Sequence, residues 1–229
     1  MAVDDAEAFA IMARCFGPVP DEEWAAVAFG ARWQEFIGAA RRLLADEGSL
    51  GRTVAPIWRH RGAPLQEALT ESETHALYSP PSPSDKRAFA ARHFVGGLDS
   101  SAVPVESLYV EWAAGPGEHV IARQKGLYHA GPALYMAHLL ESLGLGQEVE
   151  GALHADHLSV ELDLLSFLLE EGRMDEATRF LVERFGWLAD YRRRLWDVAG
   201  DDGGAFYLAI IDVILGARAR QIARETGRP

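Results

Sequence analysis

The stretch Glu150–Arg173, EGALHADHLSVELDLLSFLLEEGR, decides the fold class of this chain. From Leu158 onward, apolar residues cover most of the circumference of a helix drawn at 100° per residue. Only a narrow polar strip remains, formed by Ser159, Asp163 and Ser166. A helix that is apolar over most of its surface belongs in the centre of a bundle. The stretch therefore predicts an all-α protein with this helix in its core.

Helical periodicity continues over most of the chain, and strand patterns are almost absent. The pattern predicts a helical bundle of roughly ten helices, in two lobes joined by a short hinge. We place the hinge at the Gly115–Gly117 break, because Gly-Pro-Gly does not continue a helix. This gives an N-terminal lobe of residues 1–113 and a C-terminal lobe of residues 118–229. Pro64–Leu77 is one of the helices that we expect in the first lobe.

The composition narrows the function classes. The 229 residues are 48% hydrophobic, enough for a sizeable core. Lys and Arg number 22 against 34 Asp and Glu, a formal charge of 22 − 34 = −12. Nucleic-acid binding needs clustered basic residues, so we predict no nucleic-acid partner. The acidity fits a partner with positive charge, although it also serves solubility alone.

Two further features bear on the compartment. Cys15 is the single cysteine, so no disulfide forms within the chain and no cysteine-based zinc motif exists. No window approaches the about 18 continuous apolar residues of a membrane span, and the N-terminus has acids where a signal peptide has basic residues. We therefore expect a cytoplasmic protein without stable membrane insertion.

The residues at the start of the apolar helix carry the candidate chemistry. Asp156 directly precedes the apolar run, where its carboxylate is expected to cap the helix. Glu161 lies outside the polar strip, one turn after His157 and on the same side. Burying a lone carboxylate is costly, so this acid must be paired, protonated or at the mouth of a cleft.

A metal-binding or hydrolytic enzyme is the alternative reading of this cluster. Turn spacing could bring His154, His157 and Glu161 together to bind a metal or to transfer protons. No second His/Glu pair stands out on another helix, and the chain has no nucleophile elbow or phosphate-binding loop. We therefore predict no metal, no organic cofactor and no enzymatic activity. Two interpretations of the motif then remain. It is either a structural helix cap or a polar notch beside an apolar groove that binds a peptide.

HADHLSVELDLLSFL resembles the signature of the TorD/DmsD/NarJ-type chaperones, the redox-enzyme maturation proteins, which is roughly P-D-H-x-x-x-E-L-x-F-[LM]. The matching positions are Asp156, His157, Glu161 and Leu162, whereas Ala155 replaces the proline and Leu164 the aromatic residue. Further family-like segments occur in the same order: AARHFVGG, VPVESLYVEW and FLVERFGWLADYRRRL. The resemblance extends from about Phe89 to Leu195.

The resemblance implies a cytoplasmic, all-helical protein that is not an enzyme. Such chaperones bind the apo form of a molybdenum- or tungsten-containing oxidoreductase, often through its twin-arginine leader peptide, until the cofactor is inserted. Some members form domain-swapped dimers, so the chain is expected to be a monomer or such a dimer. Some are reported to bind guanine nucleotides, but this sequence has no visible nucleotide motif.

An acidic protein with an apolar groove would complement a leader with a basic start and an apolar stretch. We expect Asp156 and His157 at the mouth of the groove, and His157 and Glu161 as a coupled pair in its wall. The client- or peptide-binding residues that we predict are Asp156, His157, Glu161, Glu106, Ser107 and Tyr109.

Overall fold

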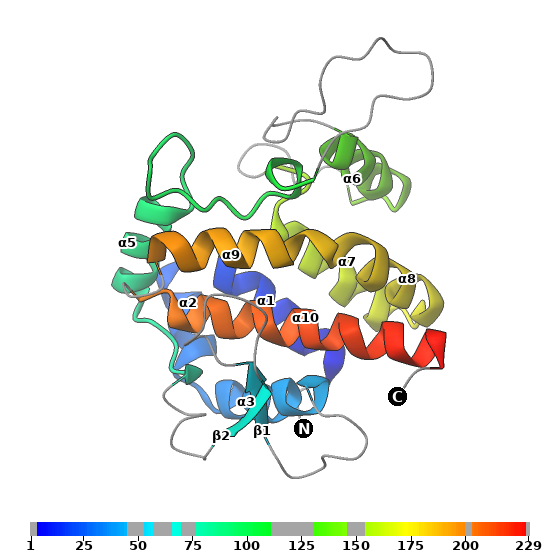
Figure 1. Ribbon diagram of the computed structural model, residues 1–229, viewed down its shortest axis with the longest axis horizontal. Coiled ribbons are helices and arrows are strands. Elements are labelled where there is room, and N and C mark those ends of the chain that lie inside the picture. Colours follow the sequence, from blue (N-terminus) through cyan, green and yellow to red (C-terminus); the bar gives the residue numbers. More distant parts are fainter. Residues whose placement is uncertain are drawn as a thin grey trace.

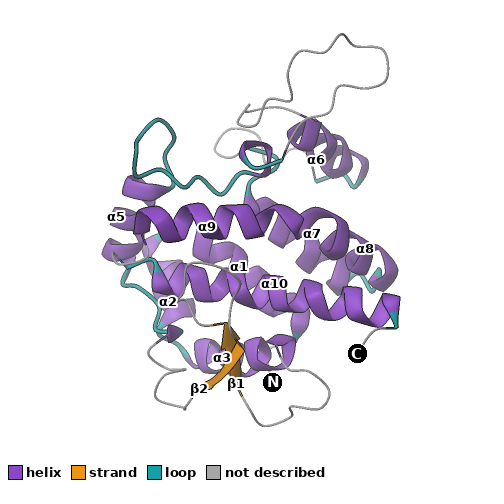
Figure 2. Ribbon diagram, viewed as in Figure 1, coloured by secondary structure: helices purple, strands orange, loops and turns teal. Residues whose placement is uncertain are grey.

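The computed structural model describes residues 4–44, 53–56, 66–69, 77–110, 131–145, 154–199 and 203–227. Helices dominate this part of the chain, so the predicted all-α class is confirmed (Figures 1 and 2). The α-helices are α1 (Asp5–Phe16), α2 (Asp21–Ala28), α3 (Ala31–Leu44), α5 (Pro83–His93), α6 (Gly131–Ser142), α7 (Leu158–Glu170), α8 (Met174–Arg184), α9 (Leu188–Ala199) and α10 (Ala205–Thr226). Two 3-10 helices, η1 (Glu106–Leu108) and η3 (Phe185–Trp187), complete the helical elements of the described residues.

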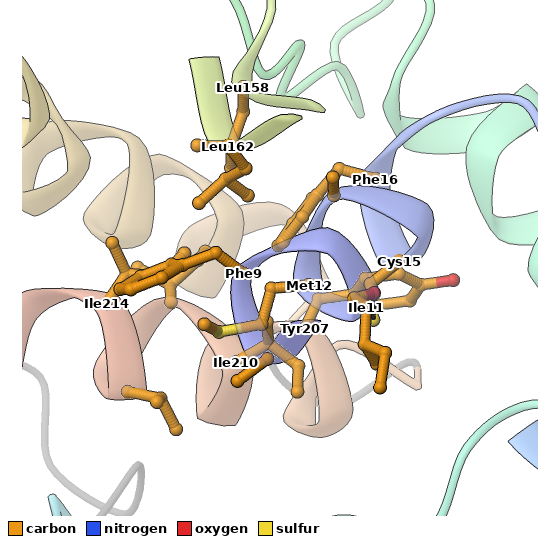
Figure 3. Packing of buried hydrophobic residues seen from close by; sticks show 14 of the residues in the cluster. Phe9, Ile11, Met12, Cys15, Phe16, Leu158, Leu162, Tyr207, Ile210 and Ile214 are labelled. Atoms are coloured by element: carbon orange, nitrogen blue, oxygen red, sulfur yellow. Dashed lines mark hydrogen bonds between the residues drawn. The ribbon is translucent and has the colours of Figure 1, made fainter. Parts of the chain in front are cut away.

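Helix α7 lies in the hydrophobic core, as its apolar circumference predicts. Leu158 and Leu162 are completely buried and face α1 (Figure 3). On the other side of α1, α10 contributes Tyr207 and Ile210 to the same cluster. Burial of such side chains stabilises the fold by roughly 1.5–3 kcal/mol each, so this three-helix contact fixes the position of α7.

Helix α1 is defined at both ends by local interactions. The carboxylate of Asp4 accepts a hydrogen bond from the backbone N–H of Glu7 at 2.9 Å and caps the N-terminus. The helix ends at Gly17, where a Cβ atom would lie only 3.1 Å from Cβ of Ser159. Glycine thus allows the end of α1 to approach the start of α7 closely.

Helices α9 and α10 are joined by a buried ion pair. Nε and Nη2 of Arg192 donate to Oδ1 and Oδ2 of Asp212 at 2.6 and 2.9 Å. Burial raises the pKa of Asp212 to about 6, although the guanidinium opposes this shift. Removing either partner would leave a buried charge without its counter-ion, so the pair fixes the register of α9 on α10.

A short antiparallel hairpin contradicts one sequence prediction. Strand β1 (Thr53–Pro56) pairs with β2 (Gln66–Leu69), with Thr53 opposite Leu69. The predicted helix over Pro64–Leu77 is therefore wrong at Gln66–Leu69. Its few apolar residues satisfied a helical period, but periodicity in a short run does not separate helix from strand.

The two predicted lobes share one hydrophobic cluster. Residues of α1 and α3 pack in the same cluster as residues of α7 and α10. The proposed hinge at residues 113–118 and the predicted helix at 118–129 lie outside the described residues. The division into residues 1–113 and 118–229 therefore stays a prediction, and the expectation of about ten helices in two lobes is not confirmed. None of the described helices is long and apolar enough to cross a membrane.

Candidate functional site

A short antiparallel contact positions the candidate site at the start of α7. Val105 forms an isolated β-bridge with His157. The N–H of Glu106 donates to the carbonyl of Asp156 at 3.0 Å, and the N–H of Leu158 donates to the carbonyl of Pro104 at 2.8 Å. These bonds hold the η1 segment against the first residues of α7, so the two segments that we selected from the sequence are brought together.

Asp156 caps η1 and not α7. Its Oδ2 accepts from the N–H of Ser107 at 2.8 Å and also from the Ser107 hydroxyl. The predicted capping of α7 by Asp156 is therefore wrong. A 3-10 helix also begins with free N–H groups, and the antiparallel contact brings those of η1 to this carboxylate. Asp156 is completely buried, and within the described residues its Oδ1 has no hydrogen-bond partner.

His157 is the N-cap of α7. Its Nδ1 accepts from the N–H of Ser159 at 3.2 Å and lies 2.8 Å from the Ser159 hydroxyl. Burial, assisted by the electrostatic interaction with His154, lowers the pKa of His157 to about 3. The imidazole is thus neutral near pH 7 and acts as a hydrogen-bond acceptor. The predicted pairing of His157 with Glu161 is not observed.

Glu161 belongs instead to a buried carboxyl pair. Its Oε2 accepts from Nε1 of Trp187 at 3.2 Å, and its Oε1 lies 3.8 Å from Nη2 of Arg184. The same nitrogen of Arg184 forms a direct ion pair with Glu106. Complete burial and the neighbouring carboxylate of Glu106 raise the pKa of Glu161 well above its usual value.

The charge of this carboxyl pair resides on Glu106. Burial raises its pKa, but Arg184 opposes the shift and is in direct contact with it. Glu161 is farther from the guanidinium, so it holds the proton. The sequence required Glu161 to be paired, protonated or at a cleft, and the structure places it beside a cation, with a pKa raised well above its usual value.

Tyr109 connects the pair to an aromatic cluster. Its ring stacks on Trp187 with the ring centroids 5.6 Å apart, and meets Tyr191 edge-on at 5.5 Å. Tyr109 is half-buried, whereas Glu106 and Ser107 are buried. The six predicted residues therefore form one region, but most of them face inward and not into solvent.

Sequence analysis missed Arg184 and Trp187 as members of this region. Both lie in the segment FLVERFGW. The available signal was Glu161, because an acid on the apolar side of α7 needs a cation or a hydrogen-bond donor from another helix. Arg184 also lies over the ring of Tyr135 in α6, with the guanidinium carbon 4.8 Å from the ring centroid. Tyr135 is half exposed, so Arg184 connects the buried carboxyls to the surface.

A surface cleft between α6 and α8 reaches this arginine. It has a volume of about 120 Å³ and is lined by both apolar and charged residues. Leu139, Leu168 and Phe180 supply apolar wall, whereas Tyr135 and Arg184 lie at the side of the carboxyl pair. The cleft can accept apolar side chains next to a charged group.

The geometry does not gather the ligands of the alternative metal site. His157 directs Nδ1 to Ser159, whereas Glu161 faces the guanidinium of Arg184. Within the described residues, no group of three His, Cys, Asp or Glu side chains is arranged to hold a metal ion. The triad of His154, His157 and Glu161 is thus not assembled in this structure.

Together, the helical fold and an inward-facing polar junction beside a surface cleft define an all-helical protein with a candidate peptide-binding region. The family model for the nitrate reductase delta subunit matches residues 62–195, more than half of the chain. The chain belongs to this family of NarJ/TorD-type chaperones, which mature molybdoenzymes. The matched range includes η1, α7, α8 and every residue of the carboxyl pair and its partners. No curated protein and no solved structure matches the chain.

Proposed function

We propose that this protein is a cytoplasmic chaperone, without enzymatic activity, for a molybdenum- or tungsten-containing oxidoreductase. It binds the apo form of the client subunit, its twin-arginine leader peptide, or both, during cofactor insertion and assembly. The family match over residues 62–195 carries this proposal. The formal charge of −12 supports it, because an acidic chaperone attracts a basic leader.

The proposed client-binding region consists of the six predicted residues, which contribute to it in different ways. The buried members, Asp156, His157, Glu161, Glu106 and Ser107, hold η1 against α7 and so shape the adjoining surface. Tyr109 is half-buried and offers part of its ring. We also propose that the chain has two lobes, residues 1–113 and 118–229, and that it is a monomer or a domain-swapped dimer. A hinge near residues 113–118 would permit two copies to exchange lobes.

Capture of the client tests the proposal. The full chain carries an affinity tag and is mixed with catalytic subunits of the host's molybdo- and tungsto-oxidoreductases, each prepared without and with its cofactor. The apo subunit should be captured, and the cofactor-loaded subunit is the matched control that should not be. Removing the leader from the apo subunit shows which part is bound. The proposal fails if no subunit is captured or if the apo and loaded forms are captured equally.

A further inference from the structure

Arg184 and the carboxyl groups of Glu106, Glu161 and Asp156 leave several of their buried polar atoms without hydrogen bonds within the described residues. Oε1 of Glu161 is buried and has no hydrogen-bond partner in the described part of the chain, although Nη2 of Arg184 lies 3.8 Å away. Nε of Arg184 is likewise buried without a hydrogen-bond partner among these residues. Oδ1 of Asp156, in the same junction, is a third such atom. A donor and two acceptors are thus left unsatisfied, and each costs free energy relative to a fully bonded arrangement.

Arg184 occupies a position from which it can leave. It is the last residue of α8, and its side chain is 17% exposed, whereas that of Glu161 is completely buried. It lines the cleft between α6 and α8 and covers the half-exposed ring of Tyr135. Rotation of the Arg184 side chain into the cleft would break its ion pair with Glu106 and leave α8 intact.

The hydrogen-bonding groups around Arg184 determine which kind of ligand could replace it. Glu106 is the charged acceptor, and Oδ1 of Asp156 and Oε1 of Glu161 have no partner among the described residues, whereas a planar guanidinium supplies several donors in a fixed fork. Leu139, Leu143 and Phe180 provide apolar wall for side chains that follow the cation. The complementary ligand is an arginine next to apolar residues in a peptide chain.

We propose that Glu106 and Glu161 form a guanidinium-binding site that Arg184 occupies in the free chaperone, and that an arginine of the client peptide displaces Arg184 into the cleft. Arg184 is then an internal competitor that neutralises Glu106 until a client arrives. This inference rests on the proposed function for the identity of the client, but the binding site itself does not depend on it.

The test uses the full chain and a short synthetic peptide in which one arginine precedes three leucines. A peptide with citrulline, which has the same length but no charge, is the ligand control. Arg184→Gln removes the competitor, and Arg193→Gln, at an exposed arginine of α9 outside the cleft, is the matched protein control. Calorimetry measures affinity, and the NMR signal of the Trp187 indole N–H, which donates to Glu161, reports on the site.

Arg184→Gln should bind the arginine peptide on the order of tenfold more tightly than the wild type, because it removes a competitor held at high effective concentration. Arg193→Gln should bind like the wild type, the citrulline peptide should show no gain, and the Trp187 signal should shift only with arginine. Equal or weaker binding by folded Arg184→Gln, equal binding of the citrulline peptide, or an unmoved Trp187 signal would overturn the inference.

If Arg184→Gln does not fold, Arg184→Lys takes its place. Lysine keeps the charge but lacks the fork, so a smaller gain in the same direction supports the inference and no gain overturns it. Failure of the proposed function has a different signature. In that case the wild type captures no oxidoreductase subunit, while Arg184→Gln still gains affinity for the arginine peptide.

Discussion

Replacing each member of the buried carboxyl pair with glutamine should have very different effects on stability. The raised pKa of Glu161 favours its protonated form, so Glu161→Gln exchanges one neutral side chain for another of nearly the same shape. Its carbonyl can still accept from Trp187. We expect a loss of less than about 1 kcal/mol in the free energy of unfolding, the net value of one ordinary hydrogen bond.

Glu106→Gln removes the counter-ion of Arg184. Removing one partner of a fully buried ion pair costs about 3–5 kcal/mol. The Arg184 side chain is 17% exposed and can turn toward water, so we expect a smaller loss, about 2 kcal/mol. The exposed Glu183, the immediate neighbour of Arg184, provides the control, and Glu183→Gln should change stability by less than about 0.5 kcal/mol.

Urea denaturation at pH 7, followed by far-UV circular dichroism, measures these differences. The slope of the transition should be the same in all variants, so that the midpoints report stability alone. A loss for Glu161→Gln that equals or exceeds the loss for Glu106→Gln would refute the assignment of the proton to Glu161 and the charge to Glu106.

Three further outcomes follow from neighbouring groups. The folded pKa of His157 is about 3 against 6.5 ordinarily, so only the unfolded chain takes up its proton below pH 6.5. Stability should therefore fall with acidification by up to about 1.4 kcal/mol per unit between these values, and His157→Asn, compared with His154→Asn in the same titration, should remove this slope. Asp156→Asn should weaken the hydrogen bonds by which this buried side chain holds Ser107 of η1, and should therefore bind a basic leader more weakly than the wild type, whereas unchanged affinity by calorimetry would place the client elsewhere. Arg192→Met leaves Asp212 buried without its cation and should cost about 3 kcal/mol in thermal denaturation, whereas an unchanged melting temperature would show that the pair is unimportant.

The sequence predicted the helical class because that signal is repeated along the chain. The apolar circumference of α7 could be satisfied only by burial, and the structure places Leu158 and Leu162 in the core. The hairpin was missed because β1 and β2 are only four residues each and are stabilised by backbone pairing with one another. No local pattern of side chains records such a pairing.

The site was predicted in its location but not in its internal connections. The helical period put Glu161 on the apolar side, which correctly required a partner or a proton. It could not supply the partner, because Arg184 approaches from another helix and Glu106 from a 3-10 turn. Capping statistics similarly favoured Asp156 over His157 as the N-cap of α7. Such statistics describe one helix end at a time, so they do not include η1, which binds the same carboxylate through Ser107.

Under the proposed function, a molybdenum- or tungsten-containing oxidoreductase of the host needs this chain to acquire its cofactor. Metal analysis of the purified oxidoreductase tests it most directly, with the enzyme taken from host cells that contain the chain, that lack it, or that have it restored. We expect the enzyme from cells without the chain to be largely free of molybdenum or tungsten, and restoring the wild-type chain to restore the metal. A fully loaded oxidoreductase from cells without the chain would contradict it.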